Sequence, residues 1–395
     1  MKILIITTKV PYPPHRGDKL KIYNIARLLS KSNKVKIITF YRNNYELEEL
    51  KMAKEKGFDI EGIELPFYKS VINLQKILHT NLPFQVAAFY SKKMFERIKK
   101  LTRDEHFDVA YFHLLVTAQY FDAVNNKTLK VIDFTDAISL YLSRYLELIN
   151  NFFKKIIYKI ELKRTLQYET IANNFNTLFV CSNADKQFLL KRNINTNIKL
   201  LLNGVDIESF NYIQTEPDPN RIIFVGNMEY FPNIDAVLYF SKEILPIVLR
   251  KNPLVKFFII GKGISKEIIA LQNNNTIVKG FVEDLRKEYL ISKVNVAPLR
   301  LGAGFPNKII ESLILGVPTV ASNISVEGLP DELKEFVLTA NDPEQFAEKI
   351  LFLLEDNRLK LKLVNEGIEK IKQNLSWENI VNCFEDYLFT QLYRN

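Results

Sequence analysis

Short runs of almost entirely apolar residues alternate along the chain with longer segments in which apolar residues recur at helical spacing. The first run, residues 2–7, is β-rich and apolar, which predicts a parallel strand buried on both faces. A loop rich in Pro and Gly follows, and residues 22–29 then carry the spacing of a buried helical face. Further strands of the first kind are predicted at 35–40, 108–113, 129–133, 178–182 and 198–201. This alternation is typical of βαβ units around a parallel sheet.

The alternation breaks at residues 203–220, where a turn is followed by a polar stretch with two prolines. We place an interdomain linker there. Beyond it, strands are predicted at 221–226, 255–261, 276–280, 294–298 and 318–321, and helices at 232–251, 306–315, 343–355 and 358–372. The sequence therefore predicts an α/β protein with two doubly wound, Rossmann-like domains, 1–210 and 211–377, that face each other across a ligand cleft.

Composition narrows the class of protein. Apolar residues make up 47% and charged residues 25% of the 395 residues, the balance of a folded globular chain. No apolar run reaches the length of a membrane-spanning helix, and the N-terminal run is too short for a secretory signal. The two cysteines, Cys181 and Cys383, form no metal-binding or disulfide pattern. We expect a cytoplasmic protein that binds no metal.

The charge is uneven along the chain. Residues 1–205 hold 33 Lys and Arg against 19 Asp and Glu, whereas the remainder holds 21 against 26. A basic half suggests an anionic partner such as lipid headgroups or nucleic acid, although Lys-rich solvated surfaces explain it equally well. Two segments, 92–103 and 152–159, mix basic and apolar residues. Each could lie on an anionic membrane, or could be a helix that packs on the sheet with its lysines outward.

The densest chemical signal lies at residues 297–311. A strand end leads through a loop with Gly302 and Gly304 into a helix, where free N–H groups and the helix dipole suit a diphosphate. Arg300 and Lys308 add positive charge on either side of this loop. Glu311 follows Lys308 by about one helical turn and could accept ribose hydroxyls. The alternative is an ordinary loop with a surface Lys–Glu pair.

Other candidates stand at strand ends in the first half. Gly17 lies in the loop after the first strand, where a small residue would let phosphates pass, or it is a plain turn glycine. His113 ends a strand, where it could take part in the function or could be a structural histidine of the core. Asp133 and Asp136 could bind acceptor hydroxyls or act as a base, and Asp136 could instead cap the following helix.

These segments carry a resemblance to a family. Residues 311–321, Glu-Ser-Leu-Ile-Leu-Gly-Val-Pro-Thr-Val-Ala, resemble the E-A-x-A-x-G-x-P-V-V-A stretch of family-4 (group 1) glycosyltransferases. Residues 203–210 resemble that family's N-G-V-D-x-x-x-F segment. Residues 226–236 are similar to a G-x-M-x-Y-x-P-N-x-D-A variant found in sugar transferases of exopolysaccharide and protein-sorting systems. The resemblance implies a GT-B fold, a nucleotide-sugar donor, no obligatory metal, and retention at the anomeric carbon.

The resemblance also implies roles for single residues. Glu311 would hold the ribose and His113 would touch the donor sugar, while Gly226, Asn227 and Asn307 would belong to the donor site. The chain departs from the family at Ala303, where a second glutamate is usual. It departs again at Asn227 and Asn233, where an Arg/Lys pair usually holds the pyrophosphate. Arg300 and Lys308 are then the local candidates for neutralising phosphate charge.

The resemblance further implies that the last helix, 378–395, packs back on the first domain, the alternative being a cap on the second. We therefore expect a glycosyltransferase that moves a sugar from a UDP- or GDP-sugar to a glycan or lipid-linked acceptor in cell-surface polysaccharide synthesis. It would need no cofactor and could sit on the inner face of the cell membrane. Alternatives are a non-catalytic nucleotide- or glycan-binding module and a GT-B nucleotide-sugar epimerase. A nucleic-acid binder is not supported by any motif.

Overall fold

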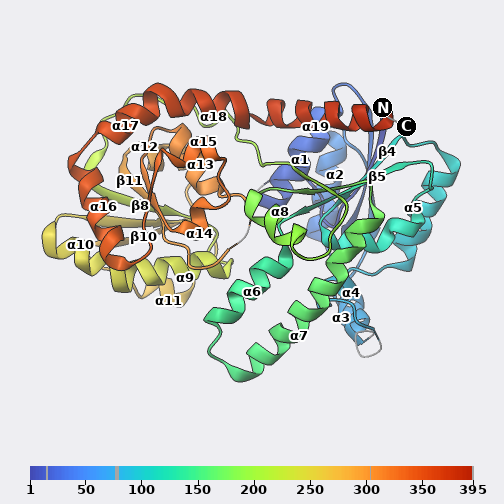
Figure 1. The fold of residues 1–395 in the computed structure, drawn as a ribbon, viewed down its shortest axis with the longest axis horizontal. Helices are drawn as coiled ribbons and strands as arrows, with labels where there is room; N and C mark the ends of the chain where they lie inside the picture. Colours follow the sequence, from blue (N-terminus) through green and yellow to red (C-terminus); the bar gives the residue numbers. More distant parts are fainter. Residues whose placement is uncertain (15–16, 76–79, 303, 394–395) are drawn as a thin grey trace. The chain divides into compact units, whose positions relative to one another are not determined.

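The computed structural model describes residues 1–14, 17–75, 80–302 and 304–393 (Figure 1). The chain forms two compact units, one made of residues 1–203 and 377–395 and the other of residues 204–376. The first unit ends at Asn203 rather than at residue 210. The reason is local, since the Val205 N–H donates to the Leu375 carbonyl at 2.7 Å and so joins this segment to the end of the second unit. No helix among the described residues is long and apolar enough to cross a bilayer.

The first unit is built on a seven-stranded parallel sheet in the order β3-β2-β1-β4-β5-β6-β7. Its strands are β1 (Lys2–Ile6), β2 (Lys34–Tyr41), β3 (Asp59–Glu64), β4 (Val109–His113), β5 (Leu129–Thr135), β6 (Thr177–Val180) and β7 (Asn197–Leu200). Six of them lie where the apolar runs predict strands. The sequence analysis missed β3 because it is an edge strand whose residues alternate between apolar and polar, with a glycine among them. Strand order reverses between β1 and β4, which is where doubly wound sheets bind ligands.

Helices cover this sheet on both faces. They are α1 (Gly17–Leu29), α2 (Asn44–Glu55), α3 (Phe67–Gln75), α4 (Phe84–Ala88), α5 (Lys92–Asp104), α6 (Ile138–Leu148), α7 (Phe152–Tyr168), α8 (Asn183–Leu190) and α19 (Trp377–Leu392), with short 3-10 segments at Leu115–Ala123 and Glu169–Asn174. The helix expected at residues 22–29 is the second half of α1, whose Ile22, Ile25 and Leu29 are fully buried.

The last helix, α19, belongs to the core of the first unit. Phe384 packs edge-on against Tyr111 and Phe179, with ring centroids 5.5 and 5.1 Å apart. The Tyr387 hydroxyl lies 2.9 Å from the Thr177 hydroxyl at the start of β6. Burial of Trp377 and Leu388 completes this contact, so residues more than two hundred positions apart share one core.

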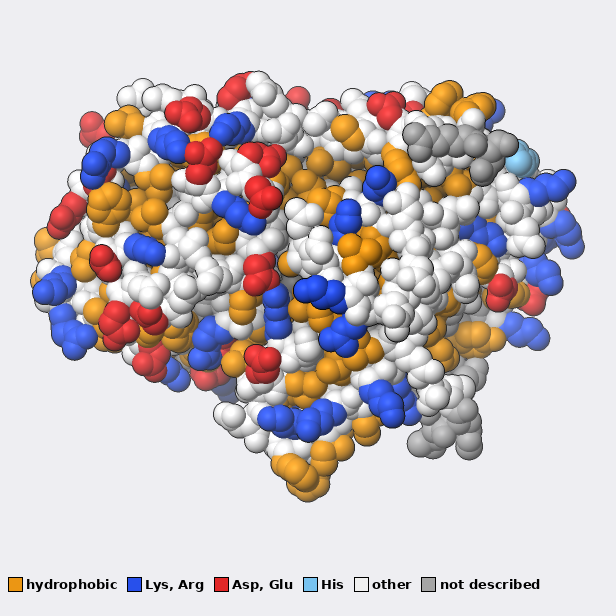
Figure 2. Space-filling view, in the orientation of Figure 1, with side chains coloured by type: hydrophobic (Ala, Val, Ile, Leu, Met, Phe, Trp, Pro, Cys, Tyr) orange, Lys and Arg blue, Asp and Glu red, His pale blue; other side chains and the backbone are white. Residues whose placement is uncertain are grey.

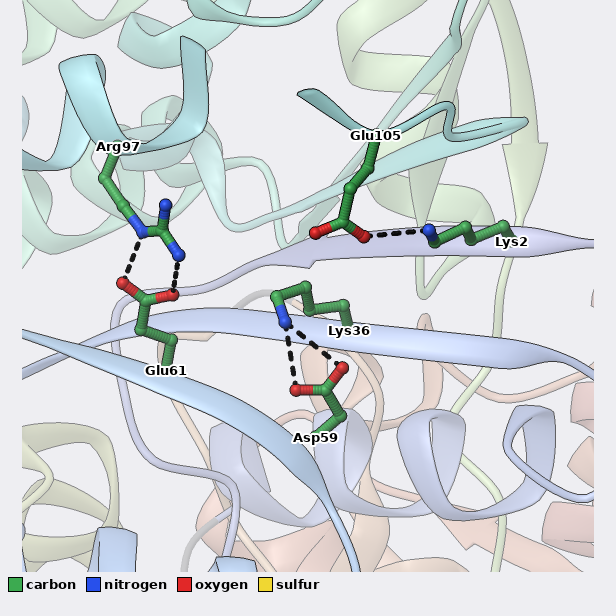
Figure 3. Close-up of polar contacts among 6 residues, drawn as sticks. All are labelled: Lys2, Lys36, Asp59, Glu61, Arg97 and Glu105. Carbon is green, nitrogen blue, oxygen red and sulfur yellow. Dashed lines mark hydrogen bonds and ion pairs between the residues drawn. The ribbon is translucent and has the colours of Figure 1, made fainter. Parts of the chain in front are cut away.

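Ion pairs join α5 to β3, the residue after α5 to β1, and β2 to β3 (Figure 3). Arg97 of α5 donates to both oxygens of Glu61 on β3, at 2.5 and 2.7 Å. Lys2 pairs with Glu105 just after α5, and Lys36 pairs with Asp59 across the β2–β3 register. The buried side of α5 is apolar. For the basic segment 92–103, the alternative of a helix that packs on the sheet with its lysines outward is therefore the right one.

The second unit has a six-stranded parallel sheet in the order β10-β9-β8-β11-β12-β13. Its strands are β8 (Asp218–Val225), β9 (Lys256–Ile260), β10 (Thr276–Gly280), β11 (Ser292–Ala297), β12 (Thr319–Ala321) and β13 (Val337–Thr339). Five match the predicted strands. The sixth, β13, has only three residues and was not predicted. The start of β8 lies inside the predicted linker, because Asp218 pairs with β11.

The helices of the second unit are α9 (Phe231–Tyr239), α10 (Leu245–Lys251), α11 (Lys266–Ile269), α12 (Leu285–Leu290), α13 (Asn307–Ile314), α14 (Asn323–Val326), α15 (Asp331–Lys334), α16 (Pro343–Glu355), α17 (Arg358–Lys362) and α18 (Ile368–Leu375). Wider π-type turns at Phe240–Ile244 and Leu363–Gly367 interrupt the predicted helices 232–251 and 358–372. Strand order reverses between β8 and β11, as it does between β1 and β4.

A buried ion pair joins α1 to the middle of the first sheet. Lys21 and Asp133 are both fully buried, and their charged atoms are 2.8 Å apart. Lys21 also donates to the Leu201 carbonyl at 2.8 Å, and Asp133 accepts from the Tyr111 hydroxyl at 2.6 Å. Every partner of this pair comes from a different element, so the pair holds α1, β4, β5 and the end of β7 in register.

Replacing Asp133 by Asn should destabilise the first unit by about 3–5 kcal/mol, because it leaves the Lys21 ammonium buried without its counter-charge. Asp59→Asn is the matched control. The Asp59 side chain is 62% exposed, so losing its ion pair with Lys36 should cost less than about 1 kcal/mol. Urea unfolding followed by circular dichroism measures both. Equal losses in the two variants would contradict the role given to the buried pair.

Candidate functional site

The residues predicted to bind the donor gather at the point where strand order reverses in the second unit. Gly226 and Asn227 follow β8, and the loop from Pro298 to Pro306 follows β11 and leads into α13. Because β8 and β11 are adjacent parallel strands, their carboxyl ends lie at the same edge of the sheet. Pro306 precedes α13 without making a side-chain cap. The first turn of α13, with Asn307 and Lys308, therefore opens onto this loop. Ala303 lies outside the described residues.

Glycine is favoured at three positions in these loops, Gly226, Gly302 and Gly304. Gly302 and Gly304 have φ angles of 155° and 87°, which disfavour any residue with a Cβ. At Gly226 the limit is space, since a Cβ would lie 2.8 Å from the side-chain amide of Asn233. The tight approach at Gly226 brings the loop after β8 against α9.

Lys308 connects the two loops. Its ammonium donates to the Asn233 side-chain oxygen at 2.5 Å and lies 4.3 Å from the centre of the Phe224 ring. Asn233 in turn donates to the Asn227 backbone carbonyl at 2.8 Å. Burial lowers the pKa of Lys308 to about 7, and the nearby charge of Glu311 opposes that shift. Among the described residues, the hydrogen-bond partner of the Lys308 ammonium is thus an amide oxygen and not a carboxylate.

Glu311 lies one turn further along α13 and is held by Tyr289. The Tyr289 hydroxyl hydrogen-bonds to the Glu311 carboxylate, and Tyr289 is fully buried. Burial raises the pKa of Glu311 to about 7, against the lowering effects of Lys308 and Tyr289. Neither Tyr289 nor Phe224 was predicted from sequence. Both are buried strand or helix aromatics, and no pattern distinguishes them from ordinary core residues.

Arg300 differs from the expectation. Its guanidinium makes a two-pronged ion pair with Asp235 of α9, with one bond at 2.9 Å, and lies 4.8 Å from the Tyr239 ring. The bond to Asp235 raises the pKa of Arg300. Its charge is already balanced by a carboxylate, so Arg300 is better described as a brace between the β11 loop and α9. Asp235 belongs to the segment 226–236 that resembled the family, which was the available signal for it.

In the first unit, His113 lies at the corresponding reversal of strand order. It ends β4, is buried, and its Nδ1 lies 3.0 Å from the hydroxyl of Thr7, which follows β1. Leu114, the next residue, has φ 74°, a left-handed backbone that is unusual for leucine. Such strained residues often stand at functional sites. Gly17 opens α1 in the loop after β1.

Asp133 does not fit the catalytic role expected for it. Its side chain is fully buried and is engaged by Lys21, Tyr111 and the Thr135 N–H. A carboxylate with this many internal partners, and no exposure to solvent, holds the core together rather than meeting an acceptor. We correct this part of the expectation.

Asp136 is placed differently from Asp133. It is partly exposed, and the Cys181 thiol donates to it at 3.1 Å. Burial and the charge of Asp185 raise the pKa of Asp136 to about 7. The helix-capping alternative is wrong, since α6 begins without a side-chain cap and the Ala137 N–H is bonded by Asp185.

Among the described residues, Asp136, Cys181 and Asp185 are the one group whose potential metal-ligating atoms all lie within 4.8 Å of one another. Hydrogen bonds account for this closeness. The Cys181 thiol donates to Asp136, and Asp185 accepts from the Ala137 N–H and from the Ser182 hydroxyl. We therefore describe the group as a hydrogen-bonded cluster.

Comparison with known proteins agrees with this arrangement. Residues 219–356 match the family model of group 1 glycosyl transferases. An uncharacterized 44.6 kDa protein in the cps region of Klebsiella pneumoniae is 24% identical over 366 residues, covering 89% of this chain and 90% of its own. The poly(ribitol-phosphate) alpha-N-acetylglucosaminyltransferase of Staphylococcus aureus is 26% identical over 221 residues, covering 53% of this chain and 43% of its own.

Among solved structures, HepE of Anabaena in complex with UDP superimposes with a TM-score of 0.69 at 15% identity, covering 99% of this chain and 100% of the other. The two parallel sheets match glycosyltransferase structures of the GT-B class. The matched family region contains Gly226, Lys308 and Glu311, the residues that meet at the edge of the second sheet. The second unit therefore carries the match to group 1 glycosyl transferases, and the fold of the chain is that of GT-B glycosyltransferase structures.

Proposed function

We propose that this enzyme transfers a sugar from a nucleotide-diphosphate donor to a glycan or lipid-linked acceptor in the synthesis of a cell-surface polysaccharide. The observation that carries the proposal is the meeting of Lys308, Asn233 and Glu311 at the reversal of strand order in the second unit. The relative from a cps region, the poly(ribitol-phosphate) transferase and the UDP complex of HepE support the polymer and the donor class.

In this proposal the second unit binds the donor. The Lys308 ammonium would neutralise charge that develops on the leaving diphosphate, together with N–H groups of the glycine loop and the start of α13. The Glu311 carboxylate would accept ribose hydroxyls, oriented by the Tyr289 hydroxyl. Asn227 and Asn233, which stand where the family usually has Arg and Lys, would position Lys308 instead of adding charge of their own.

The first unit would supply the remaining groups. His113 is the proposed contact to the donor sugar, oriented by Thr7. Asp136 is the proposed acceptor-side base, because a carboxyl group with a pKa of about 7 can take a proton near neutral pH. Transfer would proceed with retention and without an obligatory metal, as the family resemblance implies. A lipid-linked acceptor would place the enzyme peripherally on the inner face of the cell membrane.

Lys308→Met should weaken binding of UDP-glucose or another accepted UDP- or GDP-sugar by about tenfold to a hundredfold, the value of one lost charge-assisted hydrogen bond. Glu311→Gln should weaken it less, because an amide oxygen can still accept one ribose hydroxyl. Thermal-shift titration with a panel of nucleotide sugars measures the loss. The exposed Lys287→Met and Glu283→Gln in the same unit are controls that should bind like the parent. Parent-like binding in both site variants would refute the site.

Donor binding should exchange protons in opposite directions on either side of neutral pH. At pH 8, Lys308 is largely neutral in the free enzyme, and a bound diphosphate should draw a proton onto it. At pH 6, Glu311 is largely protonated, and accepting ribose hydroxyls should release its proton. Titration calorimetry in two buffers of different ionisation enthalpy measures the exchange, and the diphosphate of a nucleotide sugar does not itself titrate in this range. The release at pH 6 should vanish in Glu311→Gln. Heats that do not depend on the buffer at either pH would contradict the assignment.

A further inference from the structure

Two helices of the first unit, α3 and α7, bury polar side chains and leave large apolar side chains exposed beside their lysines. The buried positions of α3 are Ser70 and Asn73, and those of α7 are Glu161 and Thr165. A surface helix of a globular protein normally buries its apolar residues instead. Packing within the unit therefore does not explain the exposed apolar side chains.

The outward residues are large and strongly exposed. In α7 they are Phe152 (70%), Phe153 (76%), Ile156 (42%), Ile157 (50%) and Ile160 (44%), and in α3 they are Phe67 (70%), Tyr68 (59%), Val71 (47%), Ile72 (53%) and Leu74 (39%). The spacing of the α7 residues puts them on one stripe of the helix. Contiguous apolar surface of this kind marks an interaction site. For segment 152–159, the alternative of a helix that packs on the sheet with its lysines outward does not account for these exposed apolar side chains.

Buried hydrogen bonds hold both helices in this orientation. The Glu161 carboxylate accepts the N–H of Phe84, the first residue of α4, at 2.8 and 2.9 Å. The Asn73 amide donates to the Tyr90 carbonyl just beyond α4 at 2.8 Å. Because α4 lies between these two bonds and packs on α3, it links α3 and α7 into one support. Rotating either helix to hide its apolar face would leave a buried polar group without its partner.

The charge of the exposed faces of α3 and α7 indicates which partner they bind. Lys154, Lys159 and Lys163 of α7 and Lys69 of α3 are exposed, whereas residues 65–75 and 148–160 contain no acidic residue. Figure 2 shows hydrophobic side chains at the projecting end of α6 and α7, with Lys and Arg side chains beside them. Two copies of such a surface would repel each other, but anionic lipid headgroups would attract it. Phe, Tyr and Ile beside Lys are also the composition of helices that lie in the headgroup region.

We infer that α3 and α7 together form a docking surface for an anionic membrane, with Phe152, Phe153 and Phe67 entering the headgroup–acyl boundary. The inference deepens the proposed function, on which it rests for the lipid-linked acceptor, by naming the surface and the partner. Docking through these helices would hold the enzyme at the bilayer where such an acceptor is embedded.

Flotation with phosphatidylcholine vesicles, with and without phosphatidylglycerol, tests the apolar part. The enzyme should float with the mixed vesicles. The double variant Phe152→Ser, Phe153→Ser should bind these vesicles at least about tenfold more weakly. Phe67→Ser should also weaken binding. Phe281→Ser, at an equally exposed phenylalanine of the second unit, is the matched control and should bind like the parent. Parent-like binding by the double variant would overturn the inference.

The charged part has its own test. Lys154→Gln with Lys159→Gln should weaken the preference for phosphatidylglycerol, because two of the four exposed lysines are removed, and added salt should weaken binding of the parent enzyme. Sedimentation without lipid tests whether a second copy of the chain covers the surface instead. Self-association of the parent enzyme that the double phenylalanine variant removes would make the surface an interface between copies and would overturn the inference. All variants should keep the thermal shift with a nucleotide sugar. Loss of vesicle binding with donor binding intact therefore separates this surface from the donor site.

Discussion

Removal of the Lys308 ammonium and the Glu311 carboxylate from water is the interaction on which the proposed donor site depends. Burial pushes both groups toward their neutral forms. Among the described residues, an amide oxygen and an aromatic ring stand directly against the ammonium. A charge in this position gains more from an arriving anion than a solvated lysine would, because little water has to be displaced and the local dielectric is low. The glycines of the loop allow the backbone to contribute its N–H groups at the same place.

Three basic side chains of this protein differ in how far nearby carboxylates balance their charge. Lys21 is fully buried and paired with Asp133, and it serves the fold. Arg300 is half-exposed and gripped by Asp235, so it stiffens the loop that carries Gly302 and Gly304. Within the described part of the chain, the Lys308 ammonium hydrogen-bonds to the Asn233 amide and lies against the Phe224 ring, with no carboxylate bonded to it. A basic residue next to a strand end is therefore a ligand-binding group only when the surrounding carboxylates leave its charge uncompensated, and that depends on packing.

The helices of the first unit show the same dependence of role on orientation. Helix α5 and helix α7 both mix lysines with apolar residues. In α5 the apolar side is buried, and an ion pair with Glu61 of β3 holds Arg97 of the basic side (Figure 3). In α7 the Glu161 side chain takes the inward position, so the phenylalanines and isoleucines point to solvent. One buried carboxylate bonded to the backbone of α4 is enough to reverse which face of the helix the protein presents.

The sequence by itself determined the two parallel sheets, because buried strands are continuous apolar runs and the helices between them keep their own period. It also located Lys308, Glu311 and the glycine loop, since strand ends, glycines and a helix start follow one another there along the chain. It did not determine β3 or β13, which are short edge strands, or the partners Tyr289 and Asn233 that set the charges of the site. Nor could it separate Asp133 from Asp136, or α5 from α7. Those distinctions rest on contacts between residues far apart in the chain, such as Lys21 with Asp133 and Glu161 with Phe84, and periodicity carries no information about which distant residue a side chain will meet.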